Sequence, residues 1–325
     1  MIKAGIMGSA GYTGGELIRL LIDHSEVDFV FAQSKSNAGS KIYSVHQDLF
    51  GTCEMTFSQG IDKDVDVVFL CTSHGESRQT LSELDLHKDT KIIDLSNDFR
   101  LAATSNFQDK DFVYGLPEIN RDAIKNSNAV ANPGCFATSI QLAIIPLLKN
   151  GHEADFYTTA ITGSTGAGQS LSATSHFSWR TNNIQPYKTL SHQHLDEINQ
   201  TIHQVGNSQQ KPNLNFVPWR GDFARGILAS IQTTSSISID DLYAIYLDCY
   251  QEESFTFVSK DMLHLKQVVN TNKCIIHIEK VGDQVVIHSV IDNLLKGAVG
   301  QAVQNMNIMF GLGEKTGLSL KALAF

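Results

Sequence analysis

Short apolar segments alternate with amphipathic segments over the first half of this 325-residue chain, and this alternation restricts the fold more than any other feature. IKAGIMG, VDFVFAQS, DVDVVFLCT and KIIDLS predict strands, and GGELIRLLIDH and ESRQTLSELDL between them predict helices. Strands and helices that alternate in this way form right-handed βαβ units around a parallel sheet. NAVANPG predicts another strand, and CFATSIQLAIIPLLKN directly after it predicts a sheet-covering helix. We therefore expect an α/β fold.

The pattern changes after about residue 150. DFYTTAITG, GILASIQTT, CIIHIEKV and QVVIHSVI are longer and alternate more regularly, as in a sheet with one covered face. A polar stretch at about 163–195 is long enough to suggest a functional loop. NLLKGAVGQAVQNMNIMFG predicts a helix near the C-terminus. These segments predict a second, α+β domain with a large mixed or antiparallel sheet.

Three glycines, Gly8, Gly11 and Gly14, lie between the first predicted strand and the first predicted helix. Glycine allows a tight turn and the close approach of a pyrophosphate, which then lies at the helix N-terminus. The spacing differs by one residue from the common dinucleotide fingerprint, and a turn without a ligand is the alternative. We predict a Rossmann-type dinucleotide site here, with Tyr12 and Thr13 among its residues.

The end of the second predicted strand indicates the type of dinucleotide. An NAD site usually has Asp or Glu at this point to bind the ribose 2′-hydroxyl. Here the strand continues into Ser34 and Lys35, and no acidic residue follows. A hydroxyl and an ammonium group suit a 2′-phosphate, so we predict NADP as the cofactor. An ordinary polar loop is the alternative interpretation.

Asn132-Pro133-Gly134-Cys135 joins a predicted strand to a predicted helix. Pro and Gly end the strand and force a turn, so Cys135 lies at or near a helix N-terminus. The helix dipole and the free backbone amides stabilise a thiolate at this position, and the same amides can bind an oxyanion. We predict that Cys135 is a nucleophile. A buried cysteine without chemical function is the alternative.

A nucleophilic cysteine needs a base or an electrostatic partner. His192 and His194 are two residues apart and, on an extended segment, would project to one side. We predict His194 as the acid/base, with His192 as the alternative, and Glu197 could orient a ring nitrogen. The two histidines could also chelate a metal, but no third and fourth ligands accompany them at a suitable spacing, so we predict no metal site.

The net charge of -9 and the absence of a basic run argue against nucleic-acid binding. No apolar run is long enough to cross a membrane, and the N-terminal residues do not resemble a signal peptide. Five scattered cysteines indicate free thiols in a reducing compartment. We therefore expect a cytoplasmic protein whose partners are a small molecule and further copies of itself, as a dimer or a tetramer.

Several motifs, in order, resemble the N-acetyl-gamma-glutamyl-phosphate reductase family, which is related to aspartate-semialdehyde dehydrogenase and glyceraldehyde-3-phosphate dehydrogenase. They are GSAGYTGGEL, IIDLSNDFRL, YGLPEINR, NPGCFAT, GSTGAG, SHQHLDEI and VIDNLLKGAVGQAVQNMN. The chain departs from the usual family pattern at Thr165, at Gln193, where an Arg is common, and at the Cys71-Thr72-Ser73 segment.

The resemblance implies an NADP-binding domain at 1–134, completed by a C-terminal helix at 293–325, and a catalytic and oligomerisation domain at 135–292. It implies that Cys135 forms a thioester and that NADPH reduces an acyl phosphate to its semialdehyde in arginine biosynthesis. A reductase for another N-acyl glutamyl, an aminoadipyl or an aspartyl phosphate is the alternative.

An acyl phosphate of an amino acid carries anionic groups that the protein must bind. Arginine offers a planar fork of donors for such groups. Arg100 and Arg121 are therefore candidates for substrate binding, and structural salt bridges are the alternative. We also assign Asn132 and Glu197 to the substrate site.

Overall fold

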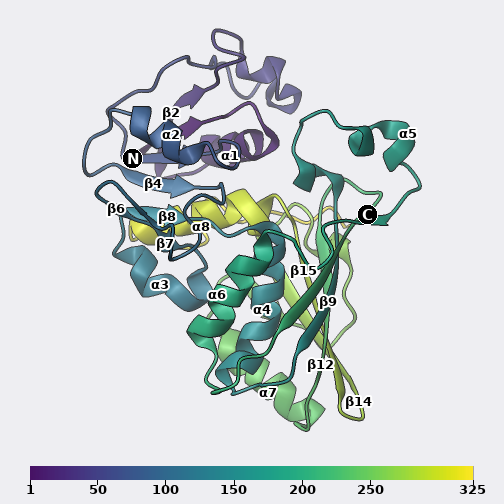
Figure 1. Cartoon of the computed structure of the whole chain (residues 1–325). Coiled ribbons are helices and arrows are strands. Elements are labelled where there is room, and N and C mark those ends of the chain that lie inside the picture. The colour runs from purple at the N-terminus through teal and green to yellow at the C-terminus, as the bar shows by residue number, and fades with distance from the viewer. Residues whose placement is uncertain (325) are drawn as a thin grey trace. The chain divides into compact units, whose positions relative to one another are not determined.

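The computed structural model describes residues 1–324, and the chain divides into two compact units. Unit 1 comprises Met1–Pro133 and Ala298–Ser319, and unit 2 comprises Gly134–Gly297 and the residues from Leu320 onward. The change of unit falls between Pro133 and Gly134, one residue before Cys135. Figure 1 shows the late return to unit 1 as the yellow helix α8 (Gly300–Met309). The functions expected for 1–134 and 135–292 stay predictions.

Unit 1 contains a six-stranded sheet in which every neighbouring pair is parallel. The strands, in their order across the sheet, are β2 (Val27–Gln33), β1 (Ile2–Met7), β3 (Val67–Leu70), β4 (Lys91–Asp94), β8 (Ala129–Ala131) and β7 (Val113–Tyr114). The inner strands are buried along most of their length because helices cover parallel sheets on both faces. The predicted parallel sheet is confirmed.

The helices of unit 1 include those predicted after the first and third strands. They are α1 (Tyr12–Ile22), α2 (Ser77–Glu83), α3 (Pro117–Lys125) and α8, with short 3₁₀ turns at Ile42–Ser44 and Gln47–Leu49 and a small hairpin of β5 (Asn106–Phe107) and β6 (Lys110–Asp111).

Helix α8 packs on α1 and α3 and is buried on all sides. Two of its buried amides donate inside unit 1, that of Asn305 to the Gly115 carbonyl and that of Asn307 to the Thr316 carbonyl, each at 2.9 Å. The sequence predicted this helix but not its buried polar side chains.

Unit 2 is built on a seven-stranded mixed sheet, as expected. The strands, in order across the sheet, are β10 (Gln185–Pro186), β11 (Leu214–Arg220), β9 (Phe156–Thr162), β12 (Ile227–Thr234), β15 (Gln284–Ile291), β14 (Cys274–Val281) and β13 (Thr256–Val258). The pairs β11–β9 and β13–β14 are parallel and the others antiparallel. Strand β9 alternates buried and exposed residues, as expected for a sheet with one covered face.

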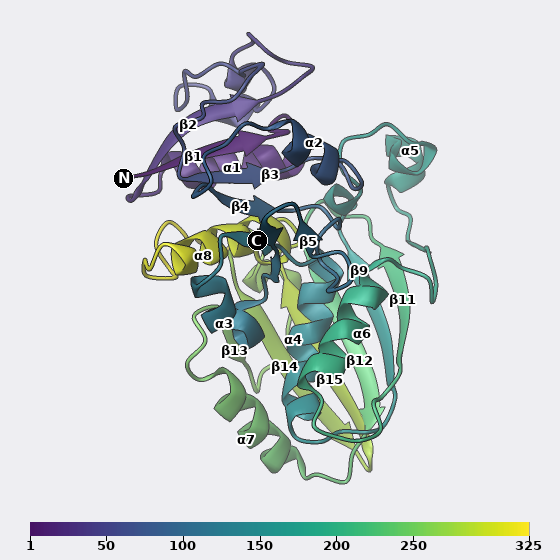
Figure 2. The same ribbon diagram turned by 60° about the vertical axis from the view of Figure 1, so that its left-hand side comes forward.

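Three helices lie on one face of this sheet: α4 (Cys135–Lys149), α6 (His194–Val205) and α7 (Ile239–Tyr250) (Figures 1 and 2). The short α5 (Phe177–Arg180), 3₁₀ turns at Ser164–Ala167, Ala173–Ser175 and Leu265–Gln267, and a π-helical turn at Leu295–Val299 complete the unit's elements. No helix in residues 1–324 has the length and apolar character needed to cross a membrane.

A backbone hydrogen bond that a proline removes from α4 is replaced by a tyrosine of α7. Pro146 has no amide hydrogen, so the carbonyl of Leu142 lacks its usual partner one turn later. The Tyr250 hydroxyl donates to this carbonyl at 2.5 Å, and the Tyr246 hydroxyl donates to the Ala143 carbonyl at 2.6 Å. The two tyrosines therefore hold the helix that begins at Cys135.

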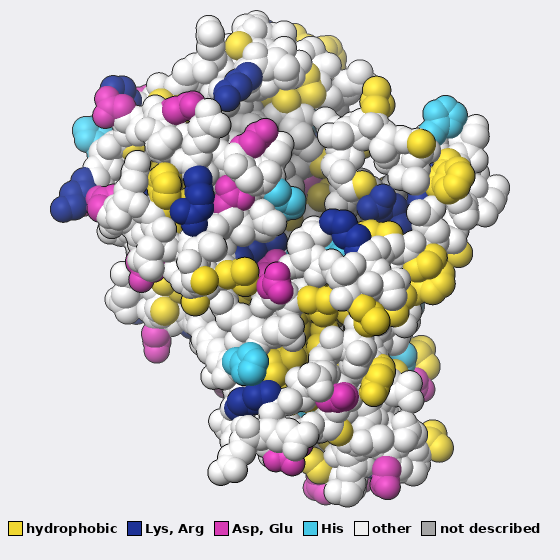
Figure 3. Space-filling view, in the orientation of Figure 1, with side chains coloured by type: hydrophobic (Ala, Val, Ile, Leu, Met, Phe, Trp, Pro, Cys, Tyr) yellow, Lys and Arg dark blue, Asp and Glu magenta, His cyan; other side chains and the backbone are white. Residues whose placement is uncertain are grey.

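Figure 3 shows one face of the molecule with its side chains coloured by type. On unit 1, Lys and Asp side chains form surface ion pairs, as in Lys3–Asp64 and Lys63–Asp85. On unit 2, hydrophobic side chains are exposed around α5, including Leu171 and Phe177.

Candidate active site

The thiol of Cys135 lies at the start of α4, as predicted. The N-cap residue, Gly134, has an extended backbone and offers no side chain to the first-turn amides. The π-helical turn approaches from the other side, where a Cβ on Gly297 would be 2.8 Å from the Cys135 Cβ. The first turn thus has no side-chain cap from Gly134, and the helix dipole at this end favours the thiolate.

His192 and His194 lie together, although not for the reason that the sequence suggested. The segment is not extended: Gln193 has helical backbone angles, and His194 is the first residue of α6. The expectation of an extended segment is wrong because the helix begins here. The turn nevertheless places the two ring centroids 4.6 Å apart, at 77°.

The ring of His194 lies against the residue that precedes the thiol. A Cβ on Gly134 would be only 2.3 Å from the His194 Nε2. The ring of Phe136, the residue after the thiol, packs edge-on to His192 at 5.4 Å between centroids. The helix start and the histidine pair thus form one packed cluster within unit 2.

The protonation state of His192 follows from its surroundings. Its Nδ1 accepts from the backbone amide of His194 at 3.2 Å, so the proton of the neutral ring is on Nε2. Burial, and then the positive charges of Lys188 and Arg220, lower the pKa of His192 to about 4. His192 is therefore neutral at neutral pH.

Glu197 reaches both sides of the cluster from α6. Its Oε2 accepts from the Gly134 amide at 3.0 Å, and its Oε1 is 3.9 Å from the His194 Nε2. The residue is almost fully buried. The carboxylate thus fixes the backbone just before Cys135 and lies close to the imidazole, as the predicted orienting role requires.

Two further residues of the cluster, Tyr187 and Arg220, were not predicted. Tyr187 directly follows β10, and Arg220 ends β11. The Arg220 Cζ is 4.7 Å from the centroid of the Tyr187 ring, which in turn is 5.7 Å from the His192 ring. Burial, and then the negative charge of the Cys135 thiolate, raise the pKa of Tyr187 to about 12, so it keeps its proton.

The glycine loop of unit 1 packs closely against neighbouring backbone. Gly8 has φ +73°, and a Cβ there would be 2.6 Å from the Cys71 carbonyl oxygen. At Gly14 a Cβ would be 2.4 Å from the Ser9 carbonyl oxygen. Gly11, the N-cap of α1, faces open space and provides no side-chain cap. A phosphate fits this helix start, because its first amides have no side-chain acceptor from the cap residue.

The other predicted cofactor residues surround this loop. The Ser9 hydroxyl donates to the Gln33 carbonyl at 2.8 Å, which ties the loop to the end of β2. Ser34 follows, with a buried hydroxyl, and Lys35 is exposed. A cation and a hydroxyl at this strand end fit a 2′-phosphate, and no acidic residue between 33 and 40 opposes one.

Tyr12 and Thr13 form the first turn of α1. Tyr12 is exposed, and the Thr13 hydroxyl is within hydrogen-bonding reach of the Cys71 sulfur. Burial raises the pKa of the Cys71 thiol to about 12, so Cys71 is not a reactive thiolate at neutral pH.

His46, which the sequence did not single out, forms a hydrogen bond through Nε2 to the Ser9 carbonyl oxygen at 2.9 Å. This bond helps to fix the glycine loop.

Three predicted substrate residues make their observed bonds inside unit 1. Arg100 is buried and donates to the Asn132 and Leu95 carbonyls at 2.8 and 2.9 Å. The Asn132 side chain donates to the Ala298 carbonyl at 2.9 Å. Arg121 forms an ion pair with Glu314 at 2.8 Å. These contacts agree with the structural alternative, and a role in substrate binding stays a prediction.

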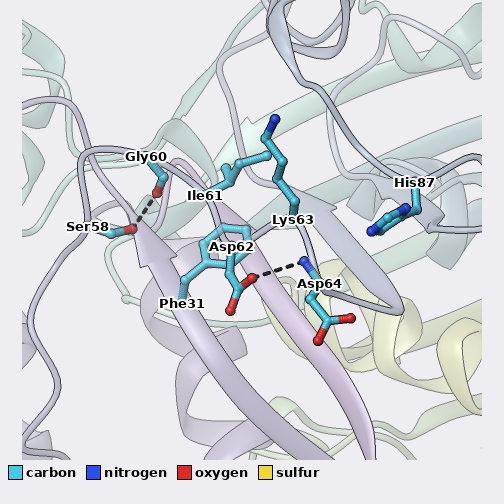
Figure 4. A pocket seen from close by; sticks show the side chains of 8 residues that line it. All are labelled: Phe31, Ser58, Gly60, Ile61, Asp62, Lys63, Asp64 and His87. Carbon is cyan, nitrogen blue, oxygen red and sulfur yellow. Dashed lines mark hydrogen bonds between the residues drawn. The ribbon is translucent and has the colours of Figure 1, made fainter.

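A hollow of about 740 Å³ on unit 1 contains none of the predicted site residues (Figure 4). It is lined by Phe31, Ser58, Gly60, Ile61, Asp62, Lys63, Asp64 and His87. In residues 1–324 no three His, Cys, Asp or Glu side chains are grouped so that they could hold a metal ion.

Comparison with known proteins identifies the two domains and the fold. Residues 3–127 match the semialdehyde dehydrogenase NAD binding domain, and residues 135–293 match the semialdehyde dehydrogenase dimerisation domain. Among solved structures, aspartate semialdehyde dehydrogenase II from Vibrio cholerae has a TM-score of 0.72 at 16% identity and covers 96% of this chain and 99% of that chain. The enzyme from Candida albicans, solved with NADP, has a TM-score of 0.65 at 16% identity over 95% of this chain and 98% of its own. These likenesses show the fold.

Several curated relatives have a much higher sequence identity to this chain than these solved structures have. The N-acetyl-gamma-glutamyl-phosphate reductase of Christiangramia forsetii is 54% identical over 99% of both chains. Those of Flavobacterium johnsoniae and Bacteroides fragilis are 53% and 51% identical over 100% of both chains. The chain therefore belongs to the N-acetyl-gamma-glutamyl-phosphate reductase family of semialdehyde dehydrogenases.

Proposed function

We propose that this protein catalyses the NADPH-dependent reductive dephosphorylation of N-acetyl-gamma-glutamyl phosphate to N-acetylglutamate 5-semialdehyde, a reaction of arginine biosynthesis. The observation that carries the proposal is the start of α4, where Cys135 follows a glycine that packs on the His194 ring. The relatives named above, at 51–54% identity over nearly the whole chain, support the substrate.

Cys135 is the nucleophile of this reaction. Its thiolate attacks the acyl carbon, and the first-turn amides of α4 stabilise the oxyanion that forms. The oxyanion collapses as the bond to the phosphate oxygen breaks, which releases phosphate and leaves a thioester on Cys135. The thioester accepts a hydride far more readily than a carboxylate does, and covalent catalysis is needed for this reason.

His194 is the acid/base and His192 is a neutral neighbour. A group with a pKa of about 4 is a weak base at neutral pH, so His192 is a poor carrier of the proton. The Glu197 carboxylate, 3.9 Å from the His194 Nε2, stabilises the imidazolium form. His194 donates a proton to the tetrahedral oxygen that follows reduction and takes it back as the carbon–sulfur bond breaks.

The cofactor is held by unit 1. The turn formed by Gly8, Gly11 and Gly14 accepts the pyrophosphate, and Ser34 and Lys35 bind the 2′-phosphate. NADPH, when bound there, supplies the hydride. The NAD binding domain match over residues 3–127 supports this assignment.

The reaction can be tested in reverse with a stable aldehyde. Purified protein is mixed with N-acetylglutamate semialdehyde, phosphate and NADP+, and the formation of NADPH is followed. We expect phosphate-dependent turnover that is faster with NADP+ than with NAD+. Replacing the substrate with aspartate semialdehyde, aminoadipate semialdehyde or other N-acyl derivatives identifies a related acyl phosphate if one of these is the better substrate. No turnover with any of them would contradict the proposal.

We further expect a homo-oligomer, a dimer or a tetramer, in the cytoplasm. The match of residues 135–293 to a dimerisation domain supports self-association. Light scattering of the purified protein measures the oligomeric state. A monomer at micromolar concentration would contradict the expected self-association.

A further inference from the structure

Arg220 is a cation that has no carboxylate partner in the described part of the chain. Among the ion pairs of residues 1–324 none includes Arg220, and its buried Nε has no hydrogen-bond partner there. An unsatisfied buried donor on a charged group is costly, so its retention needs a reason. The nearest acidic side chain in sequence, Asp222, instead accepts from the Asn182 amide at 2.5 Å.

Arg180, which lies beside Arg220, has a structural role in this region, because its guanidinium is hydrogen-bonded to backbone carbonyls. Its guanidinium donates to the Thr174 carbonyl at 3.2 Å and to the Arg220 carbonyl at 3.1 Å. These bonds hold the segment around α5 to the end of β11. Arg220 contributes only its backbone to this connection, so its side chain is available for another purpose.

The position of Arg220 connects it to the thiol through a short series of contacts. Its guanidinium lies 4.7 Å from the centre of the Tyr187 ring, and Tyr187 lies against His192. His192 packs on His194, whose ring touches Gly134 directly before Cys135. The Tyr187 ring holds the guanidinium through a cation–π contact at 4.7 Å, and the Arg220 Nε has no hydrogen-bond partner among the described residues.

The charges nearest to His192 are mainly positive. Lys188, the second cation, donates to the neutral side-chain oxygen of Gln193 at 2.7 Å. The one carboxylate of the cluster, Glu197, is bound to the Gly134 amide. An anion beside His192 therefore meets the positive charges of Lys188 and Arg220.

We propose that Arg220 binds an oxyanion of the substrate beside Cys135 and so restricts the enzyme to acidic acyl compounds. The inference rests on the proposed function for the nature of the substrate. The oxyanion is either the carboxylate of the glutamyl group or the phosphate. Both suit the fork of donors that an arginine presents.

The first test does not depend on the substrate. Iodoacetate and iodoacetamide both alkylate a thiolate, with a new carbon–sulfur bond and release of iodide, but only iodoacetate is an anion. The rates of Cys135 modification are measured by mass spectrometry for the wild type, Arg220→Gln, Arg220→Lys and, as a matched control, Lys260→Gln. Lys260 also lies over a tyrosine ring, 5.6 Å from the centre of Tyr243.

We expect Arg220→Gln to lower the ratio of the iodoacetate rate to the iodoacetamide rate about 10-fold, because the cation that attracts the anion is removed. Arg220→Lys keeps the charge and should keep most of the ratio, and Lys260→Gln should keep all of it. A ratio unchanged in Arg220→Gln would overturn the proposal. This result does not depend on whether any acyl phosphate is a substrate, so it is separate from the proposed function.

The second test identifies the oxyanion in the reverse reaction. If Arg220 binds phosphate, Arg220→Gln raises the KM for phosphate about 10- to 100-fold and leaves that for the semialdehyde nearly unchanged. If it binds the carboxylate, the KM for the semialdehyde rises instead. Either result supports the proposal, and unchanged values of both would overturn it.

Discussion

The imidazole ring of His194 lies so close to Gly134 that a Cβ on residue 134 would be 2.3 Å from Nε2. Gly134→Ala must therefore push the ring away from the thiol. A displacement of about 1 Å is enough to lower kcat about 100-fold. Steady-state kinetics measure the effect, with Gly60→Ala as the control, since a Cβ on Gly60 meets nothing within 4 Å. Full activity in Gly134→Ala would show that the contact has no catalytic importance.

The two histidines are predicted to differ in their effect on catalysis. His194→Asn removes the acid/base and should lower kcat about 100- to 10,000-fold. His192→Asn removes a ring that is neutral at neutral pH and should cost no more than about 10-fold. Parallel measurements of kcat at several pH values decide the assignment, and the reverse order of the two losses would transfer the role to His192.

His192 also makes stability depend on pH. Its pKa is about 4 in the folded protein and about 6.5 in an unfolded chain. Between these values the unfolded chain binds a proton that the folded protein excludes, so the free energy of unfolding rises as the pH rises from about 4 to 6.5. The contribution is at most about 3 kcal/mol. Urea unfolding across this range should show a shallower rise for His192→Gln than for the wild type, and equal slopes would contradict this cause.

Tyr250 is predicted to stabilise α4 by replacing the bond that Pro146 cannot make. Tyr250→Phe should cost about 1–2 kcal/mol, because the buried Leu142 carbonyl loses its donor. The cost should shrink in a Pro146→Ala background, where the new backbone amide can donate to the same carbonyl. Chemical denaturation of the wild type, the two single variants and the double variant measures the coupling energy between Tyr250 and Pro146. Tyr157→Phe, at an exposed position, is the control. Equal costs in the two backgrounds would disprove the compensation.

Local sequence patterns were sufficient to predict where α4 begins and where the glycine loop turns. Pro-Gly before an apolar helix determines where Cys135 lies, and glycines at a strand–helix junction determine a turn, because both depend on neighbouring residues only. The prediction of an extended segment around Gln193 failed because spacing alone does not reveal where a helix begins. The same two rings are brought together by a turn.

The part of the site that the sequence did not reveal depends on contacts between distant residues. Tyr187 and Arg220 meet because β10 pairs with β11, which itself contains Pro218 and so lacks the usual pattern of an inner strand. Helix α7, in contrast, could have been found, since Ser238 accepts from the Asp241 amide in a capping motif that the sequence displays. The buried polar residues of α8 carry no local signal at all.

The central claim, a thioester on Cys135, is tested most directly by leaving phosphate out of the reverse reaction. The enzyme is mixed rapidly with N-acetylglutamate semialdehyde and NADP+, and the burst of NADPH is measured together with the mass of the peptide that contains Cys135. The account predicts a burst of about one NADPH per active site and an acyl group on Cys135, with neither in Cys135→Ala. A burst that persists in Cys135→Ala, or an acyl group on another residue, would contradict it.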